Sequence, residues 1–491
     1  MPYSARRLIF ALFLLPGATL AAAIIDPALQ AQFHDQGPYE ALIELRDQAS
    51  LLASAENRVD RLRQSAAQLR SLAQNTQAPL LDWLRTQNIE HRSYWIVNSV
   101  WVKATAKQLQ ELAKRDDIAA IHNNPQIRNQ LPQPAADNRD SRGSIEPSIS
   151  LINAPDVWNM GIDGAGVVIG GQDTGYQWDH PGLIEHYRGW NGASADHNYH
   201  WHDSIHSGGG SCGPDNLAPC DDHGHGTHTM GTMVGDDGGA NQVGVAPGAR
   251  WIGCRNMDVG NGTPATYLEC LQWFLSPTDL NNENPDPAMA PHVINNSWGC
   301  PTSEGCTDPN ILLDAVDNLR AAGIVVVVSA GNSGPGCSSV TTPAAIYTSS
   351  FSVAASSISD QIAGFSSRGP VTVDGSGRLK PDITAPGVSI RSTTRGGGYG
   401  TSSGTSMAGP HVAGLVALII AANPSLAGQV DTIEAIIRDS AVPMDTTQDC
   451  GGTAGSVPNN VFGWGRIDAL AAVNMAMTDT IHHDGFEVAA P

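Results

Sequence analysis

Residues 404–414, Gly-Thr-Ser-Met-Ala-Gly-Pro-His-Val-Ala-Gly, constrain the fold and the chemistry of this chain more than any other stretch. The segment opens with a turn of small residues and leads into an apolar run, 412–419, with helical character. A serine at such a turn lies at a helix N-terminus, where backbone N–H groups and the helix dipole favour negative charge. This position suits a nucleophile that passes through an alkoxide-like state, provided that a base lies within hydrogen-bond reach. Ser406 is therefore the candidate nucleophile.

Two other stretches can supply the base and the group that orients it. Residues 222–232 have the sequence Asp-His-Gly-His-Gly-Thr-His-Thr-Met-Gly-Thr and contain His225. Residues 167–175 form an apolar run of strand type that ends in Asp173, followed by Thr-Gly. The end of a strand is a usual place for functional groups in open α/β folds. The chain order aspartate, histidine, serine is one of the known orders of a catalytic triad.

These three stretches resemble the signatures of the subtilisin-like serine peptidases, the subtilases. Ser406 matches the nucleophile of Gly-Thr-Ser-Met-Ala, His225 the first histidine of His-Gly-Thr-His, and Asp173 the acid of Asp-Thr-Gly. A fourth match, Ser-Ala-Gly-Asn at 329–332, carries the asparagine that supplies the oxyanion hole in this family. The resemblance implies four catalytic residues: Asp173, His225, Ser406 and Asn332.

The resemblance also covers the substrate cleft. Residues 293–299 match the segment that lines the cleft in this family, and their sequence is most similar to the bacillopeptidase F branch. Trp298 stands where a smaller apolar residue is common, so we expect one reshaped subsite or, alternatively, a core tryptophan. On the opposite wall of the cleft, residues 260–262 match the edge strand of the family, to which an extended substrate would add a further strand. The implied substrate-binding residues are Gly260, Asn261, Gly262, Ser297, Trp298 and Gly299.

Three other functions compete with this interpretation. An aspartic peptidase also uses Asp-Thr-Gly, but its carboxylate dyad needs two copies and this chain has one. A zinc hydrolase could use the histidine clusters at 223–228 and in the histidine-rich insertion, residues 193–222. A catalytically inactive binding protein of the same fold would lack a catalytic residue type, and none is missing here. We interpret His180 and His228 as structural.

The resemblance spans roughly residues 150 to 475 and implies a three-layer α/β sandwich with a mainly parallel sheet, assigned to residues 149–476. It implies hydrolysis of proteins or peptides through an acyl-enzyme, by a monomer that needs no cofactor for the chemistry. Subtilases often bind structural calcium, and an acidic chain could do so, although no calcium-loop pattern occurs here. The sequence therefore identifies no metal-binding residues.

The N-terminus has the features of an export signal. Charged Arg6-Arg7, an apolar run at 8–15 and small residues at 18–23 follow one another as in a secretory signal peptide, assigned to residues 1–23. The run is too short for a membrane anchor, which needs about 20 residues. No later stretch is judged apolar enough to span, so we expect a secreted protein, extracellular or periplasmic, with no membrane contact after the signal is removed.

All eight cysteines lie between Cys212 and Cys450, and an even number in an exported chain predicts disulfides. No Cys-x-x-Cys pair occurs, which disfavours a zinc site. Cys300 and Cys306 flank a short turn and are the favoured pair. The secondary candidates are Cys212–Cys220 and Cys254–Cys270, and Cys337–Cys450 is the remainder.

The segment before the enzyme has its own pattern. Strand-like and helix-like stretches alternate through residues 24–128 in an order close to βαββαβ, with one strand hard to place. The segment resembles the inhibitory propeptide of subtilases, a small α+β ferredoxin-like domain that assists folding and then blocks the site; a permanent accessory domain is the alternative. Residues 129–148 contain three prolines and few apolar residues, which is typical of an exposed linker suited to processing. Residues 477–491 form an acidic tail.

The charge is unevenly distributed. Residues 24–140 carry 13 Lys/Arg and 14 Asp/Glu, whereas residues 141–491 carry 12 and 34, a net charge of −22. An acidic catalytic part argues against nucleic acid as a partner, because nucleic-acid binding depends on neutralising phosphates. It is typical of a soluble protein that resists self-association.

Overall fold

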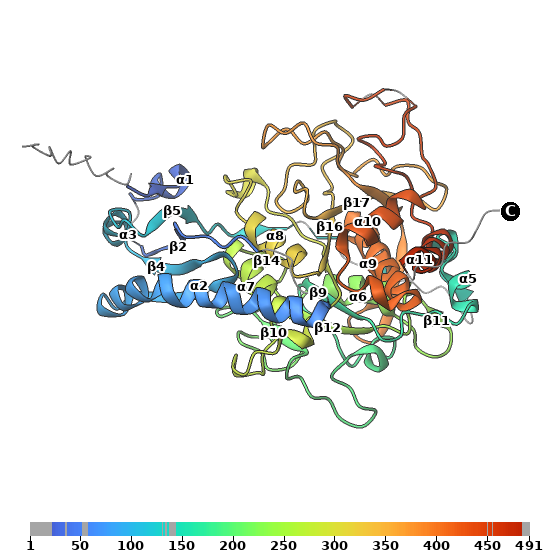
Figure 1. Cartoon of the computed structure of the whole chain (residues 1–491), viewed down its shortest axis with the longest axis horizontal. Helices are drawn as coiled ribbons and strands as arrows, with labels where there is room; N and C mark the ends of the chain where they lie inside the picture. The colour runs from blue at the N-terminus through green and yellow to red at the C-terminus, as the bar shows by residue number, and fades with distance from the viewer. Residues whose placement is uncertain are drawn as a thin grey trace, which may run out of the picture.

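The computed structural model describes most of the chain as two parts that lie side by side, a smaller N-terminal part and a larger part that extends to the C-terminus (Figure 1). Nearly all of the predicted signal peptide and the end of the predicted acidic tail lie outside the described residues. The described residues are 22–34, 37–51, 57–129, 131–132, 135–136, 144–448, 450–453 and 455–483.

The larger part is built on a seven-stranded sheet in which every neighbouring pair is parallel. Its three central strands begin with apolar residues, end in polar ones and are buried along almost their whole length, as expected for a parallel sheet covered on both faces. In spatial order the strands are β10 (Trp201–Asp203), β12 (Arg250–Arg255), β9 (Val168–Asp173), β15 (Val293–Asn296), β16 (Val325–Ser329), β17 (Phe351–Ser356) and β18 (Ile383–Pro386).

Helices pack against both faces of this sheet. One hydrophobic core joins the strands to α6 (His225–Val234), α9 (Thr405–Ala422), α10 (Val430–Asp439) and α11 (Ala469–His483). A second core on the other face joins them to α7 (Pro264–Leu275) and α8 (Leu313–Ala321). The predicted three-layer sandwich is therefore confirmed. The boundary predicted at residue 476 falls within α11.

Helix α9 is the central helix of this fold. Against the sequence expectation, it is long and apolar enough to cross a membrane by length and composition. However, 89% of that helix is buried inside the protein, and it contacts α6, α11 and strands β15 to β18. Its uniform apolar character therefore reflects burial in the core, since a helix that is hydrophobic on all sides is either a core helix or a membrane span.

The N-terminal part has its own five-stranded sheet, of spatial order β1-β5-β2-β4-β3, and its own core. Without the short β1 and α1, the chain order is βαββαβ, as the sequence pattern indicated. The strand that could not be placed is β3, which a left-handed turn at Asn98 separates from β4. The elements are β1 (Ile24–Ile25), α1 (Pro27–Gln30), β2 (Tyr39–Leu45), α2 (Arg58–Thr86), β3 (Glu90–Tyr94), β4 (Ser99–Ala104), α3 (Ala106–Leu112) and β5 (Ile118–Asn123).

The two parts contact each other directly. Asn318 on α8 donates from Nδ2 to the Ile96 carbonyl at 2.7 Å, and Arg58 on α2 donates to the Ala290 carbonyl at 3.0 Å. The segment between them, part of the predicted linker, pairs with the larger part, and α4 begins inside that linker. The connecting segment contains β6 (Ile127–Arg128), β7 (Ala135–Ala136), β8 (Ser144–Ile145) and α4 (Pro147–Leu151), and α5 (Ala154–Asn159) follows it. The strands of the larger part near it are β11 (Asn241–Gln242), β13 (Met257–Asp258), β14 (Asn261–Gly262), β19 (Ile390–Thr394) and β20 (Gly398–Ser402).

All four predicted disulfides are present, and the described residues contain no free cysteine. Their Cα–Cα distances lie between 5.3 and 5.8 Å, within the normal range for such bonds. The Cys254–Cys270 bond joins β12 to α7, and Cys337–Cys450 closes a separation of 113 residues. One disulfide therefore ties a helix to the sheet, and the other three join loop residues of the larger part.

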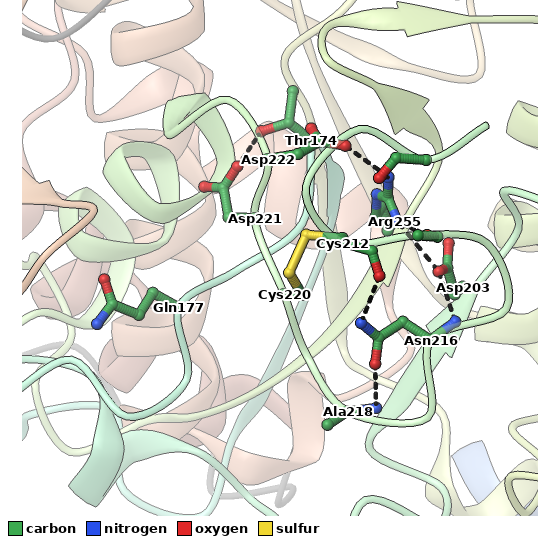
Figure 2. The surroundings of a disulfide bond; sticks show 12 residues. Thr174, Gln177, Asp203, Cys212, Asn216, Ala218, Cys220, Asp221, Asp222 and Arg255 are labelled. Carbon is green, nitrogen blue, oxygen red and sulfur yellow. Dashed lines mark hydrogen bonds and ion pairs between the residues drawn. A yellow bond between two sulfur atoms is a disulfide. The ribbon is translucent and has the colours of Figure 1, made fainter.

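The histidine-rich insertion is held by Arg255, the last residue of β12, whose side chain is fully buried. Its guanidinium lies 2.5 Å from a carboxylate oxygen of Asp222 and 3.2 Å from one of Asp203. It also donates to two backbone carbonyls of the insertion at 2.8 Å. Figure 2 shows this cluster beside the Cys212–Cys220 disulfide. One cation therefore joins the sheet, the insertion and the segment that leads to His225.

We predict that Arg255→Met lowers the free energy of unfolding by about 3–5 kcal/mol, because removing one partner of a buried ion pair leaves its carboxylates uncompensated. Denaturant unfolding of the purified protein measures the change. Arg250→Met is the matched control, because Arg250 is an exposed residue of the same strand, and it should change stability by less than about 0.5 kcal/mol. Equal effects of the two variants would contradict the structural role of Arg255.

Candidate active site

Asp173 and His225 form a buried hydrogen-bonded pair. Asp173 is the last residue of β9, which lies inside the sheet between β12 and β15, and His225 is the first residue of α6. His225 Nδ1 lies 2.8 Å from one carboxylate oxygen of Asp173 and 3.0 Å from the other. Because a carboxylate accepts hydrogen bonds, Nδ1 carries the proton of the neutral ring and Nε2 is the acceptor.

Asp221, which the motifs did not single out, holds this pair in place. Its carboxylate accepts hydrogen bonds from backbone N–H groups at the start of α6, at 2.7 and 3.0 Å. It also accepts from the Thr174 hydroxyl at 2.9 Å, an interaction drawn in Figure 2. One carboxylate thus joins the loop after Asp173 to the helix that carries His225. An acidic residue just before a predicted helix is a known start signal and could have identified Asp221.

Ser406 lies in the first turn of α9 and is buried, with 3% of its surface exposed. Its hydroxyl donates to the Ser297 carbonyl at 3.2 Å. His225 Nε2 is also buried and has no hydrogen-bond partner within the described part of the chain. Because α6 and α9 pack against each other, a hydroxyl and an unpaired ring nitrogen lie on adjacent helices. The hydroxyl must leave Ser297 before it can give its proton to a base.

Asn332 follows β16 and is fixed by the residue before the serine. Its Oδ1 accepts hydrogen bonds from the Thr405 backbone N–H at 2.9 Å and from the Thr405 hydroxyl at 3.0 Å. The amide nitrogen Nδ2 is therefore the end of this side chain that can donate to a ligand. Asn332 and Ser406 line the same cavity, of about 370 Å³.

The predicted substrate-binding residues lie in two groups. Three of them line the Ser406 cavity, and Trp298 does so although it is only 7% exposed. The other three belong to the β13–β14 hairpin, where β14 pairs antiparallel with β6 of the N-terminal segment. This edge strand is therefore paired with an extended segment, as expected for a substrate. The first group is Ser297, Trp298 and Gly299; the second is Gly260, Asn261 and Gly262.

The predicted linker runs past the serine. On one side of the cavity β6 pairs with β14, and farther along the chain β7 pairs with β20, the strand just before α9. Between these pairings, Asn129 and Leu131 line the cavity together with Ser406. The segment 127–136 is thus paired with the larger part on both sides of the cavity, through β6 at its start and β7 at its end.

The remaining histidines of the motifs make structural contacts. His228 Nε2 lies 3.1 Å from two backbone carbonyls, and burial lowers its pKa to about 3. His180 Nε2 lies 2.8 Å from the Gly398 carbonyl, and burial lowers its pKa as well. In the insertion, His202 and His206 both contact Glu269 on α7. Within the described ranges, no group of three or more His, Cys, Asp or Glu side chains is arranged to hold a metal ion.

Comparison with known proteins agrees with these observations. A sequence model of the subtilase family matches residues 164–465. Bacillopeptidase F of Bacillus subtilis (strain 168) is 36% identical over 450 residues, which cover 87% of this chain and 30% of that protein. Subtilisin E of the same organism is 32% identical over 337 residues, covering 68% of this chain and 73% of that protein. Subtilisin of Bacillus pumilus is 33% identical over 285 residues, covering 57% and 86%.

The resemblance inferred from the motifs is therefore confirmed. The chain spans less than a third of the length of bacillopeptidase F, so the properties of that whole protein cannot be assigned to this chain from the match. The matched family region contains the sheet, α6, α9 and all four motif residues. This chain belongs to the subtilase family of serine endopeptidases.

Proposed function

We propose that this chain is a secreted serine endopeptidase that hydrolyses peptide bonds of proteins through an acyl-enzyme, and that it is made as a self-processing precursor. The observation that carries the proposal is the buried Asp173–His225 pair, whose unpaired Nε2 lies on a helix packed against the helix of Ser406. Proteins and peptides are the substrates, as the family implies.

The proposed reaction follows the known steps of a Ser-His-Asp triad. The Ser406 oxygen attacks the scissile carbonyl carbon while His225 Nε2 takes the hydroxyl proton, and Asp173 stabilises the resulting imidazolium through Nδ1–H. The tetrahedral oxyanion accepts hydrogen bonds from Asn332 Nδ2 and the Ser406 backbone N–H. The C–N bond then breaks and the amine leaves with the proton of His225. Water repeats the sequence on the acyl-enzyme, so the carboxylate product leaves and Ser406 regains its proton.

We propose residues 24–128 as an inhibitory propeptide and residues 129–148 as the linker that is cut. Two features support this role. The linker crosses the cavity that contains Ser406, and the N-terminal part contacts the larger part at several places. One of these contacts is an ion pair of His122 with Asp308 at 3.3 Å. Burial opposes protonation of His122, but its two carboxylate partners outweigh burial and raise its pKa to about 9.

Export and a monomeric state complete the proposal. Four disulfides suit an oxidising compartment such as the cell exterior or the periplasm. The signal-like residues 1–23 provide the route. The large negative charge of the catalytic part supports a soluble monomer, and no cofactor is assigned to the chemistry.

We predict that Ser406→Ala abolishes hydrolysis of a protein substrate such as casein, while the variant stays folded and unfolds in a cooperative thermal transition. The wild type should be inactivated by a serine-directed fluorophosphonate and should keep its activity in a metal chelator. Labelling should map to Ser406 by mass spectrometry. Chelator-sensitive activity in an enzyme that resists the fluorophosphonate would favour a zinc hydrolase instead.

We predict that Asn332→Ala lowers kcat by roughly 10²- to 10³-fold and leaves KM nearly unchanged, because the oxyanion forms only in the transition state. This range is the loss found when an oxyanion-hole asparagine is removed from a subtilisin, a member of the same family. Steady-state kinetics on one peptide substrate separate the two constants. A change confined to KM would show that Asn332 binds substrate and does not stabilise the oxyanion.

We predict that the precursor cuts itself between residues 129 and 135, within the segment that crosses the cavity. Wild type and Ser406→Ala are expressed with their signal peptides, and the N-termini of the secreted proteins are sequenced. Wild type should begin between residues 130 and 135, whereas the variant should retain residues 24–128. The same new N-terminus in both proteins would mean that another protease does the processing. An uncut and active wild type would make residues 24–128 a permanent accessory domain.

A further inference from the structure

The side chain of Asn129 is held in the substrate cleft by specific hydrogen bonds. Its Nδ2 donates to the Tyr267 hydroxyl at 3.0 Å and lies 3.5 Å from the Met257 sulfur. Its Oδ1 accepts a hydrogen bond from the Gly299 backbone N–H at 3.1 Å. Both ends of the amide are therefore bound by groups of the larger part, one on α7 and one on the wall formed by residues 297–299.

The hydroxyl that receives this amide lies on a rigid support. Tyr267 is fully buried and stacks on Trp298, with ring centroids 3.9 Å apart and an angle of 17° between the planes. The ring also lies against Gly262, where an added Cβ would collide with it. The missing side chain of Gly262 and the indole of Trp298 thus fix the ring, and with it the position of the hydroxyl.

The charge around this hydroxyl favours a neutral side chain. Burial raises the pKa of the Tyr267 hydroxyl, which therefore stays protonated, and the nearby Glu304 carboxylate raises it further while the bond from Asn129 opposes them. Glu304 lines the same cavity as Asn129. A substrate carboxylate in the place of the Asn129 amide would be repelled by the negative charge of Glu304.

We infer that Met257, Tyr267 and the Gly299 N–H form a subsite that selects asparagine at one fixed position of the substrate, and that Asn129 occupies it in the precursor. The inference rests on the proposed function and deepens it. An isosteric leucine would leave the Gly299 N–H and the Tyr267 hydroxyl without partners in a partly buried site, and sites that hydrogen-bond a substrate group discriminate strongly against analogues that lack it. Aspartate fits the same shape but is repelled by Glu304.

The test uses a synthetic peptide with the sequence of residues 124–136 and its Asn129→Leu and Asn129→Asp versions. Each competes with casein for the mature enzyme, and a peptide that binds the cleft inhibits whether or not it is cut. The leucine peptide should inhibit at least about tenfold more weakly than the asparagine peptide, the equivalent of one lost hydrogen bond. The aspartate peptide should also be weaker. A Gln126→Leu peptide is the control, because Gln126 is exposed, and it should inhibit as the parent does.

Two enzyme variants then locate the selectivity. Tyr267→Phe keeps the stacked ring and removes the hydroxyl, so the preference for asparagine over leucine should fall about tenfold. Glu304→Gln should reduce the gap between the asparagine and aspartate peptides by about two- to fivefold. Tyr347→Phe is the matched control, because that buried tyrosine contacts Pro309 and Leu312, and it should leave all the ratios unchanged.

Two outcomes would overturn the inference: equal inhibition by the asparagine and leucine peptides, or an asparagine preference that Tyr267→Phe does not reduce. Both outcomes are measured with an enzyme that hydrolyses casein and reacts with a fluorophosphonate. The proposed subsite can therefore be disproved while the proposed serine peptidase activity is upheld. If casein is not hydrolysed by a folded wild type, it is the proposed function that fails.

Discussion

The alignment of the Asp173–His225 pair depends on one carboxylate, that of Asp221, which binds the start of α6 and the loop after β9 at the same time. The approach of these two elements is close, because a Cβ on Gly226 would collide with the Gly175 carbonyl. A negative charge is favourable there, since the first N–H groups of a helix have no partner within it and carry partial positive charge. Hydrogen-bonding geometry at a helix end thus sets the position of the imidazole.

The motif residues could be predicted from sequence because each short motif combines an element boundary with one reactive side chain. Asp173 ends a strand, while His225 and Ser406 begin helices, so local pattern was enough to place them. The groups that support them were not predicted. Thr174 and Asp221 are 47 residues apart, and Arg255 reaches Asp222 across 33, so no local pattern reports these contacts. Roles for the catalytic residues stay predictions until the variants are measured.

The N-terminal part shows where pattern reasoning fails. Helix α3 does follow a local signal, because Thr105 and Gln108 form a capping box that the sequence displays. Strand β3, Glu-His-Arg-Ser-Tyr, was missed because it is an edge strand with polar residues and no apolar alternation. Its pairing is decided by β4, which is buried beside it.

Helix α9 of the larger part shows a different limit of sequence patterns. Its composition is apolar throughout, and composition alone cannot distinguish burial in protein from burial in lipid.

The Cys337–Cys450 disulfide has a consequence for a protease exposed to its own activity. The bond spans 113 residues, and Ser406 with its helix lies inside that span. An exposed loop tip such as residues 395–396 is a natural place for a nick. A single nick there leaves the two fragments covalently joined through the disulfide. The helix that carries Ser406 therefore stays attached to the part of the chain that contains the sheet, so a cut in the backbone does not by itself separate the proposed active-site residues.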